Sequence, residues 1–315
     1  MPSDLLGLRH PRKHLNPHQA SDVGPQYAKA VVDGVLTGGV YALMAAGLTL
    51  IFGVMDIINI AQGIMVILGA YLSYVLSVHL GLDLFATLVL TVPALFVIGV
   101  TVEWVFMRRL ADRERTAMSI LVTYAVAIII EGILTQVFGV SFIQLHASYV
   151  NSSVHVLGFY LPYIYLYGFA LAIVLLGGLY AILYLTRFGQ SLRAALQDRR
   201  AAELIGIDVE RVRTITFGIG IAVTAAGGMV FGATNSFNPN SGYDLISRLL
   251  TIVILGGLGS IGGALLAALF MLVLEDVVAV AWSPVWSTLV FFAALVIVLT
   301  FRPQGLFGRA AARAQ

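Results

Sequence analysis

Long apolar runs separated by short polar segments are the main feature of this chain. Each run is longer than the roughly 10 residues of a membrane-spanning β-strand and lacks the alternation of such a strand. The pattern therefore predicts an all-α fold, a polytopic transmembrane bundle of about eight helical segments. The runs cover residues 27–53, 57–79, 84–107, 116–139, 162–186, 214–234, 248–276 and 285–301.

Composition agrees with a membrane protein and indicates one domain. Hydrophobic residues make up 59% of the chain and charged residues 11%, whereas soluble domains carry about 25% charged residues. We predict a membrane domain over residues 27–308, a flexible N-terminal tail at 1–26 and a C-terminal tail at 309–315. The chain contains no cysteine, which excludes disulfides and thiolate metal ligands, and we predict no metal site.

The distribution of arginine predicts the orientation of the helices. Arginines fill the loops at 108–115 and 187–213, whereas 140–161 and 235–247 contain neither lysine nor arginine. By the positive-inside rule the first two loops are cytoplasmic and the last two are outside. Arginines after the final run place the C-terminus inside as well. Crossing parity puts the N-terminus outside, although three basic residues in its tail favour the inside. Because the arginines cluster beside apolar runs, they indicate how the helices are oriented in the membrane and do not indicate nucleic-acid binding.

A glycine-rich stretch interrupts the run at 248–276. If the runs at 248–276 and 285–301 each crossed the membrane once, the chain would go from the outside loop at 235–247 into the cell and out again. The C-terminus is predicted to be inside, so one of these runs must not cross the membrane as a single helix. Each glycine lowers helix stability by about 1 kcal/mol relative to alanine, which favours a broken or re-entrant helix lined by protein or water. The alternative is close helix packing at GxxxG spacing. The stretch contains Gly256, Gly257, Gly259, Ser260, Gly262 and Gly263.

Polar residues also interrupt the first half of the chain. Asp56, Asn59 and Gln62 recur every three residues and would share one face of a helix. One interruption in each half is typical of transporters with discontinuous helices. We therefore place these residues, together with the glycine-rich stretch, in a translocation pathway. Glu131 lies inside an apolar run, where an acid marks either that pathway or a buried structural pair.

Residues 187–213 form a polar island that holds ten of the 34 charged residues. An arginine at the bilayer centre costs about 2.5–3.5 kcal/mol, so the island is predicted to be a cytoplasmic loop. It reads as a short amphipathic helix that Gly206 ends, followed by a helix that Asp208 caps. A helix lying on lipid headgroups is the alternative, but the interleaved acids favour a protein partner.

Five separated segments resemble the permease subunits of bacterial ABC importers for branched-chain amino acids, the LivH type. The resemblance extends from about residue 39 to residue 308. The segments are 39–50, 58–63, 201–207, 255–263 and 302–308. Members of the family often have histidine where this chain has Gln62, and glutamine does not titrate near neutral pH.

The resemblance implies a role and a set of partners. The island would be the loop that couples transport to an ATPase, through Arg199, Arg200, Ala202, Glu203 and Gly206. The chain has no G-x-x-x-x-G-K-[ST] phosphate loop, so ATP and Mg would bind to partner subunits and this chain would be no enzyme and bind no cofactor. The implied partners are a LivM-like permease, two LivG/LivF-like ATPases and a substrate-binding protein, all at the bacterial cytoplasmic membrane and its lipid.

Three other functions remain as alternatives. A permease for urea or short-chain amides shares the motifs quoted above. A secondary transporter that needs no ATPase would also use intramembrane glycines and Glu131. An intramembrane hydrolase with Ser260 as nucleophile would need a basic partner, yet every histidine falls in the tail or a loop.

Overall fold

The computed structural model describes residues 23–110, 115–150, 152–156 and 159–307. Over these residues the chain is a bundle of helices with one short β-hairpin, and eight of the described helices are long and apolar enough to cross a membrane. The predicted all-α polytopic fold is therefore confirmed. Residues 1–22 of the predicted N-terminal tail, Arg113, Gly308 and the predicted C-terminal tail lie outside the described residues.

The helices follow the apolar runs closely. Those that span the bundle at full length are α2 (Val23–Met55), α3 (Gln62–Leu80), α4 (Leu84–Val105), α5 (Arg115–Phe138), α6 (Tyr163–Leu185), α9 (Val209–Thr234), α11 (Ile261–Ala281) and α12 (Pro284–Phe301). The shorter elements are η1 (Met107–Arg109), α7 (Arg187–Gln197), α8 (Arg199–Leu204), α10 (Ser241–Gly256) and the antiparallel strands β1 (Ser153–Val156) and β2 (Phe159–Pro162).

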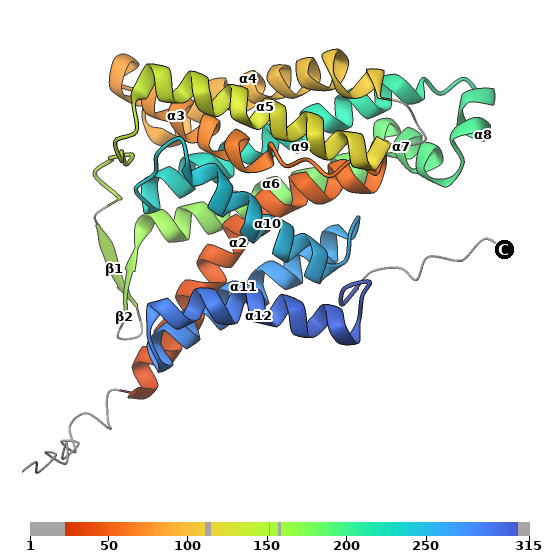
Figure 1. The fold of residues 1–315 in the computed structure, drawn as a ribbon. Helices are drawn as coiled ribbons and strands as arrows, with labels where there is room; N and C mark the ends of the chain where they lie inside the picture. The colour runs from red at the N-terminus through yellow and green to blue at the C-terminus, as the bar shows by residue number, and fades with distance from the viewer. Residues whose placement is uncertain (1–22, 111–114, 151, 157–158, 308–315) are drawn as a thin grey trace, which may run out of the picture.

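The bundle has two distinct ends, which we name by the elements that mark them. The hairpin end carries β1 and β2, together with the start of α2, and the basic end carries α7 and α8 from the island (Figure 1). The last described residues of the chain also lie at the basic end (Figure 1). Helix α2 begins at Val23, inside the segment that the sequence predicted to be tail.

Helices α2 and α9 lie at the centre of the bundle, and α2 packs antiparallel along α11. A Cβ atom on Gly34 would lie 2.6 Å from the Val273 Cα, and one on Gly38 would lie 3.0 Å from the Leu269 Cα. Two helix backbones in direct contact maximise dispersion attraction, which replaces the hydrophobic effect as the force between helices in lipid. This seam of glycines fixes the path of α11.

The glycine-rich stretch breaks the run at 248–276 into two helices. Helix α10 ends at Gly256, and Gly257 and Gly259 adopt positive φ angles of 97° and 80°. Ser260 then caps α11 by accepting a hydrogen bond from the Gly263 amide at 3.1 Å. Because α11 returns along α2 toward the hairpin end, the run begins and ends at the same end of the bundle (Figure 1). The predicted break is confirmed, and it removes the parity conflict.

Close packing and helix breakage both occur at these glycines. A Cβ atom on Gly263 would lie 2.1 Å from the Gly256 carbonyl oxygen, whereas one on the neighbouring Gly262 would meet nothing within 4 Å. The two interpretations of the sequence are therefore compatible, because the tight turn brings the end of α10 against the start of α11.

We expect Gly263→Ala to destabilise the protein, since backbone atoms at the break cannot move aside as a flexible side chain would. The expected cost is about 1–3 kcal/mol, measured as a lower thermal unfolding temperature of the purified protein in detergent. Gly262→Ala is the matched control and should leave that temperature unchanged or raise it slightly. Equal unfolding temperatures for the two variants would contradict the close contact between α10 and α11.

Candidate functional site

The first polar interruption is a non-helical segment between α2 and α3. Helix α2 ends at Met55, Asp56 has a positive φ of 51°, and α3 begins only at Gln62. The conditional prediction that the three polar residues share a helix face is therefore wrong, since residues 56–61 are not helical. Asp56 is exposed, and its carbonyl accepts a hydrogen bond from the Thr116 hydroxyl of α5 at 2.8 Å.

The other two polar residues of this interruption form a buried amide network. The Asn59 Nδ2 donates to the Gln62 Oε1 at 2.9 Å, and the Gln62 Nε2 donates to the Gly220 carbonyl of α9 at 3.2 Å. On the other side, the Ile60 amide donates to the Thr123 hydroxyl of α5 at 3.1 Å. The Thr123 bond satisfies a backbone amide of the non-helical segment, and the Gln62 bond joins the start of α3 to the middle of α9. Asn59 and Gln62 thus hold the break in place.

The last turn of α2 contacts the glycine break at the basic end. A Cβ atom on Gly53 would lie 3.2 Å from the Gly259 Cα. The segment after α12 folds back onto the same place, where the Leu306 amide donates to the Leu255 carbonyl at 2.8 Å. The 302–308 segment that carries part of the family resemblance therefore supplies a donor to the carbonyl end of α10.

A groove of about 590 Å³ lies between the island and the glycine break. Arg193 and Leu196 of α7 line one side of the groove, and Gly259, Ser260 and Gly262 line another. Arg193 also donates a hydrogen bond to the Leu183 carbonyl at the end of α6. Several residues of the predicted pathway therefore lie beside the island.

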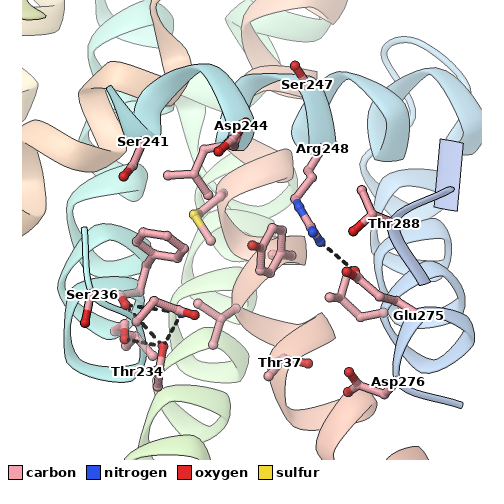
Figure 2. A pocket seen from close by; sticks show the side chains of 18 of the residues that line it. Thr37, Thr234, Ser236, Ser241, Asp244, Ser247, Arg248, Glu275, Asp276 and Thr288 are labelled. Carbon is pink, nitrogen blue, oxygen red and sulfur yellow. Dashed lines mark hydrogen bonds and ion pairs between the residues drawn. The ribbon is translucent and has the colours of Figure 1, made fainter. Parts of the chain in front are cut away.

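A second and larger cavity, of about 750 Å³, lies among α2, α6, α9, α10, α11 and α12. We call it the charged cavity, because Asp244, Arg248, Glu275 and Asp276 lie on its wall. Figure 2 shows Arg248 reaching from α10 toward Glu275 of α11, to which its Nη1 donates at 2.5 Å. The guanidinium also lies 5.4 Å from the centre of the Phe291 ring of α12. One basic and three acidic side chains therefore share this cavity.

Sequence reasoning missed Arg248 as a functional residue. It was treated as the first residue of an apolar run, where an arginine is ordinarily an interfacial anchor. In the structure α10 begins seven residues earlier at Ser241, so Arg248 lies mid-helix with a side chain only 23% exposed. The useful signal was the pair of acids, Glu275 and Asp276, at the far end of the same interrupted run.

Glu131 lies outside the charged cavity. Its Oε2 accepts a hydrogen bond from the Tyr243 hydroxyl of α10 at 2.5 Å, and the two side chains line a separate cleft of only about 10 Å³ with Ile60 and Ile64. Of the two interpretations of Glu131, this geometry favours the structural pair, which joins α5 to α10.

Three side-chain caps shape the island. Thr186 accepts from the Gly189 amide at the start of α7, and Asp198 accepts from the Ala201 amide at the start of α8. Asp208 accepts from the Arg211 amide and so begins α9 as the sequence predicts. The island therefore contains two short helices before α9, with Asp198 dividing the single amphipathic helix that was expected.

The end of α8 has the hydrogen-bond pattern of a Schellman motif. The Ile207 amide donates to the Ala202 carbonyl and the Gly206 amide to the Glu203 carbonyl, both at 3.0 Å. Gly206 has the left-handed φ of 86° that this motif requires, so the predicted helix stop is confirmed. The turn leaves Leu204 88% exposed and Ile205 75% exposed. These two residues form the apolar tip of the island.

The predicted coupling residues divide into internal and outward-facing groups. Arg199 pairs with Glu203 at 3.0 Å and with Glu210 at 2.8 Å, which fastens α8 to α9. Ala202 is 2% exposed, whereas Arg200 is exposed. The apolar tip was missed, because two hydrophobic residues at the end of an amphipathic helix look like part of its buried face.

Comparison with known proteins identifies the family. The sequence model described as "Branched-chain amino acid transport system / permease component" matches residues 30–299. The chain belongs to this family. It is 29% identical over 301 residues to the high-affinity branched-chain amino acid transport system permease protein BraD of Pseudomonas aeruginosa, covering 90% of this chain and 96% of BraD. It is 28% identical over 309 residues to LivH of Escherichia coli K12, with the same shares. The resemblance stated from the sequence is confirmed, and the chain is a multi-pass membrane permease.

We expect Arg248 and Glu275 to be energetically coupled. Removing either partner alone leaves a largely buried charge without its ion pair, whereas removing both does not. In a double-mutant cycle of Arg248→Met and Glu275→Gln, measured by thermal unfolding in detergent, the expected coupling energy is roughly 0.5–3 kcal/mol.

The control for this cycle is the more exposed pair of Lys29 and Asp33, 3.7 Å apart on α2, whose side chains are 47% and 32% exposed. A cycle of Lys29→Met and Asp33→Asn should give no more than about 0.5 kcal/mol. Strictly additive effects at Arg248 and Glu275 would show that their contact contributes nothing to stability.

Proposed function

We propose that this chain is the membrane-spanning subunit of an ABC importer for branched-chain amino acids. The apolar tip of the island carries the proposal. Membership of the permease family supports the transport role, and BraD and LivH are named for branched-chain amino acid transport. This permease binds no cofactor of its own, and ATP with Mg is hydrolysed by two partner ATPases of the LivG/LivF kind.

The tip is suited to dock into an ATPase groove. Leu204 and Ile205 are exposed at the far end of a charged segment, where neither lipid nor the rest of the bundle covers them. The caps and the ion pairs of Arg199 hold them on a short, rigid support. Exposed apolar residues on a rigid support lose little conformational freedom when a partner covers them, which favours binding. Motion of the ATPase would reach the bundle through α7 and α9.

The remaining partners follow from the two ends of the bundle. A substrate-binding protein docks at the hairpin end, outside the bacterial cytoplasmic membrane, and the island faces the cytoplasm as the positive-inside rule requires. A second, LivM-like permease completes the pathway. The charged cavity and the groove beside the glycine break lie toward different ends of the bundle, which is the arrangement that alternating access needs.

The charged cavity favours amino acids over urea or short-chain amides. Urea is neutral, so a wall with one arginine and three acids gives it no advantage over water. An α-amino acid carries both charges. ATP dependence separates the proposal from a secondary transporter, which would work without the ATPases.

The direct test is uptake by the complete transporter, reconstituted in liposomes with its ATPases, second permease and binding protein. We expect ATP-dependent uptake of labelled leucine and at most a small uptake of labelled urea measured in parallel. Urea uptake alone would favour the alternative substrate, and leucine uptake by this chain without ATPases would overturn the ABC assignment.

Replacing both residues of the apolar tip should weaken docking of the ATPases and thereby reduce transport. For Leu204→Ser with Ile205→Ser we expect at least a tenfold loss of leucine uptake and of ATPase copurification, because the interface loses its anchors. The control is Leu185→Ser, which changes a leucine that is 77% exposed at the end of α6. Its copurification with the ATPases should stay at the wild-type level. Full uptake by the tip variant would exclude the tip from coupling.

Two substitutions at Gly206 separate backbone strain from contact with a partner. Gly206→Ala and Gly206→Leu both force a side chain into the left-handed region, at about 1–2 kcal/mol, and neither meets an atom of this chain at Cβ within 4 Å. The two variants should therefore unfold at similar temperatures. We expect uptake to be much lower for Gly206→Leu, because its bulk would strike the ATPase. Equal uptake at equal stability would place Gly206 outside the interface.

A further inference from the structure

The charged cavity contains an acid, Asp276, that has no ion-pair partner within contact distance among the described side chains. Glu275 pairs with Arg248 at 2.5 Å, but Asp276 forms no hydrogen bond or ion pair with the side chains that the structure describes. Figure 2 shows the Asp276 carboxylate near Thr37, on the same side of the cavity as Glu275. A carboxylate in the membrane part of a protein is costly unless water or a cation compensates it. The cavity therefore favours a cationic group beside Asp276.

The same cavity also offers donors to an anionic group. Only one nitrogen of the Arg248 guanidinium is used by Glu275, and a guanidinium carries five N–H donors in a fixed plane. Arg248 lies 5.4 Å from the centre of the Phe291 ring, and this contact helps to fix the guanidinium. A ligand that carries both charges can thus be bound at both ends.

The remaining walls are apolar and the space is of suitable size. Met44, Leu245, Leu272 and Phe292 line the cavity with the charged residues. Its volume of about 750 Å³ lies within the roughly 300–1,000 Å³ of small-molecule sites. Asp244, Ser247 and Thr288 are exposed on the wall, so the cavity is open and not sealed. An aliphatic side chain therefore has a surface to pack on while the charged groups are held.

We infer that the charged cavity binds the α-ammonium and α-carboxylate groups of an aliphatic amino acid in transit, with Asp276 facing the ammonium and Arg248 facing the carboxylate. The inference rests on the proposed function, because it names where the transported molecule contacts this chain. It assigns the recognition of the substrate's charged groups to α10 and α11, the two helices that the glycine break joins.

The absence of cysteine from the chain provides a direct assay. Ser247→Cys and Thr288→Cys each place one thiol on the cavity wall, and Ser153→Cys on β1 is the control at the hairpin end outside the cavity. Labelling of this chain in the assembled complex is followed by mass spectrometry with membrane-impermeant thiosulfonates. Leucine at millimolar concentration should slow labelling at both cavity positions at least threefold and leave the control unchanged.

Ligands that lack one charge test the two assignments separately. Leucinamide keeps only the ammonium group and 4-methylpentanoate keeps only the carboxylate. Both should protect the Ser247→Cys thiol more weakly than leucine does, and urea should not protect it. In a chain that also carries Asp276→Asn, protection by leucine should fall to the level of 4-methylpentanoate, while protection by 4-methylpentanoate itself should not fall. A general distortion of the cavity would weaken both ligands equally and would contradict the assignment.

The test remains decisive if Asp276→Asn impairs folding. The ligand series in the chain with native acids then decides alone, because equal protection by leucine, leucinamide and 4-methylpentanoate would overturn the inference. No protection by leucine at either cavity position would overturn it as well. Failure of the proposed function looks different, because ATP-driven uptake of leucine would be absent in the unmodified transporter whatever the labelling shows.

Discussion

Backbone hydrogen bonding in apolar surroundings is the constraint on which this structure depends. A helix satisfies its own amides and carbonyls, but every interruption exposes groups that lipid cannot bind. At the first break, the hydroxyls of Thr116 and Thr123 of α5 form hydrogen bonds with the free backbone. At the second break, Ser260 and the Leu306 amide perform the same task. Segments far apart in the sequence are thus brought together by the groups that the breaks leave free.

Features of the fold that depend on one local rule could be predicted from the sequence. Long apolar runs specified the spanning helices, and the glycine-rich stretch with the parity argument predicted the reversal between α10 and α11. Gly206 and Asp208 were found because helix stops and caps depend on single residues. Residues 57–61 were assigned to a helix because they are mostly apolar. Their true conformation depends on threonines more than 50 positions later, which no local pattern records.

The charged cavity was beyond local rules for a different reason. The first turns of α10 face a cavity and are therefore polar, so the apolar run seemed to begin only at Arg248. The ion pair with Glu275 spans 27 residues and forms only because the break turns α11 back beside α10. A pattern of hydrophobic positions cannot distinguish an arginine at the membrane surface from one that lines a polar cavity. Likewise, the exposure of Leu204 and Ile205 depends on how α8 is held against α9.

The backbone contact between Gly53 and Gly259 has a mechanical consequence. With no side chain between them, the last turn of α2 and the break between α10 and α11 form one joint of direct backbone contact. The island lies across a groove from this joint, and α10 and α11 extend from it to the charged cavity. A rotation at the basic end would therefore be transmitted along α10 and α11 to the cavity walls.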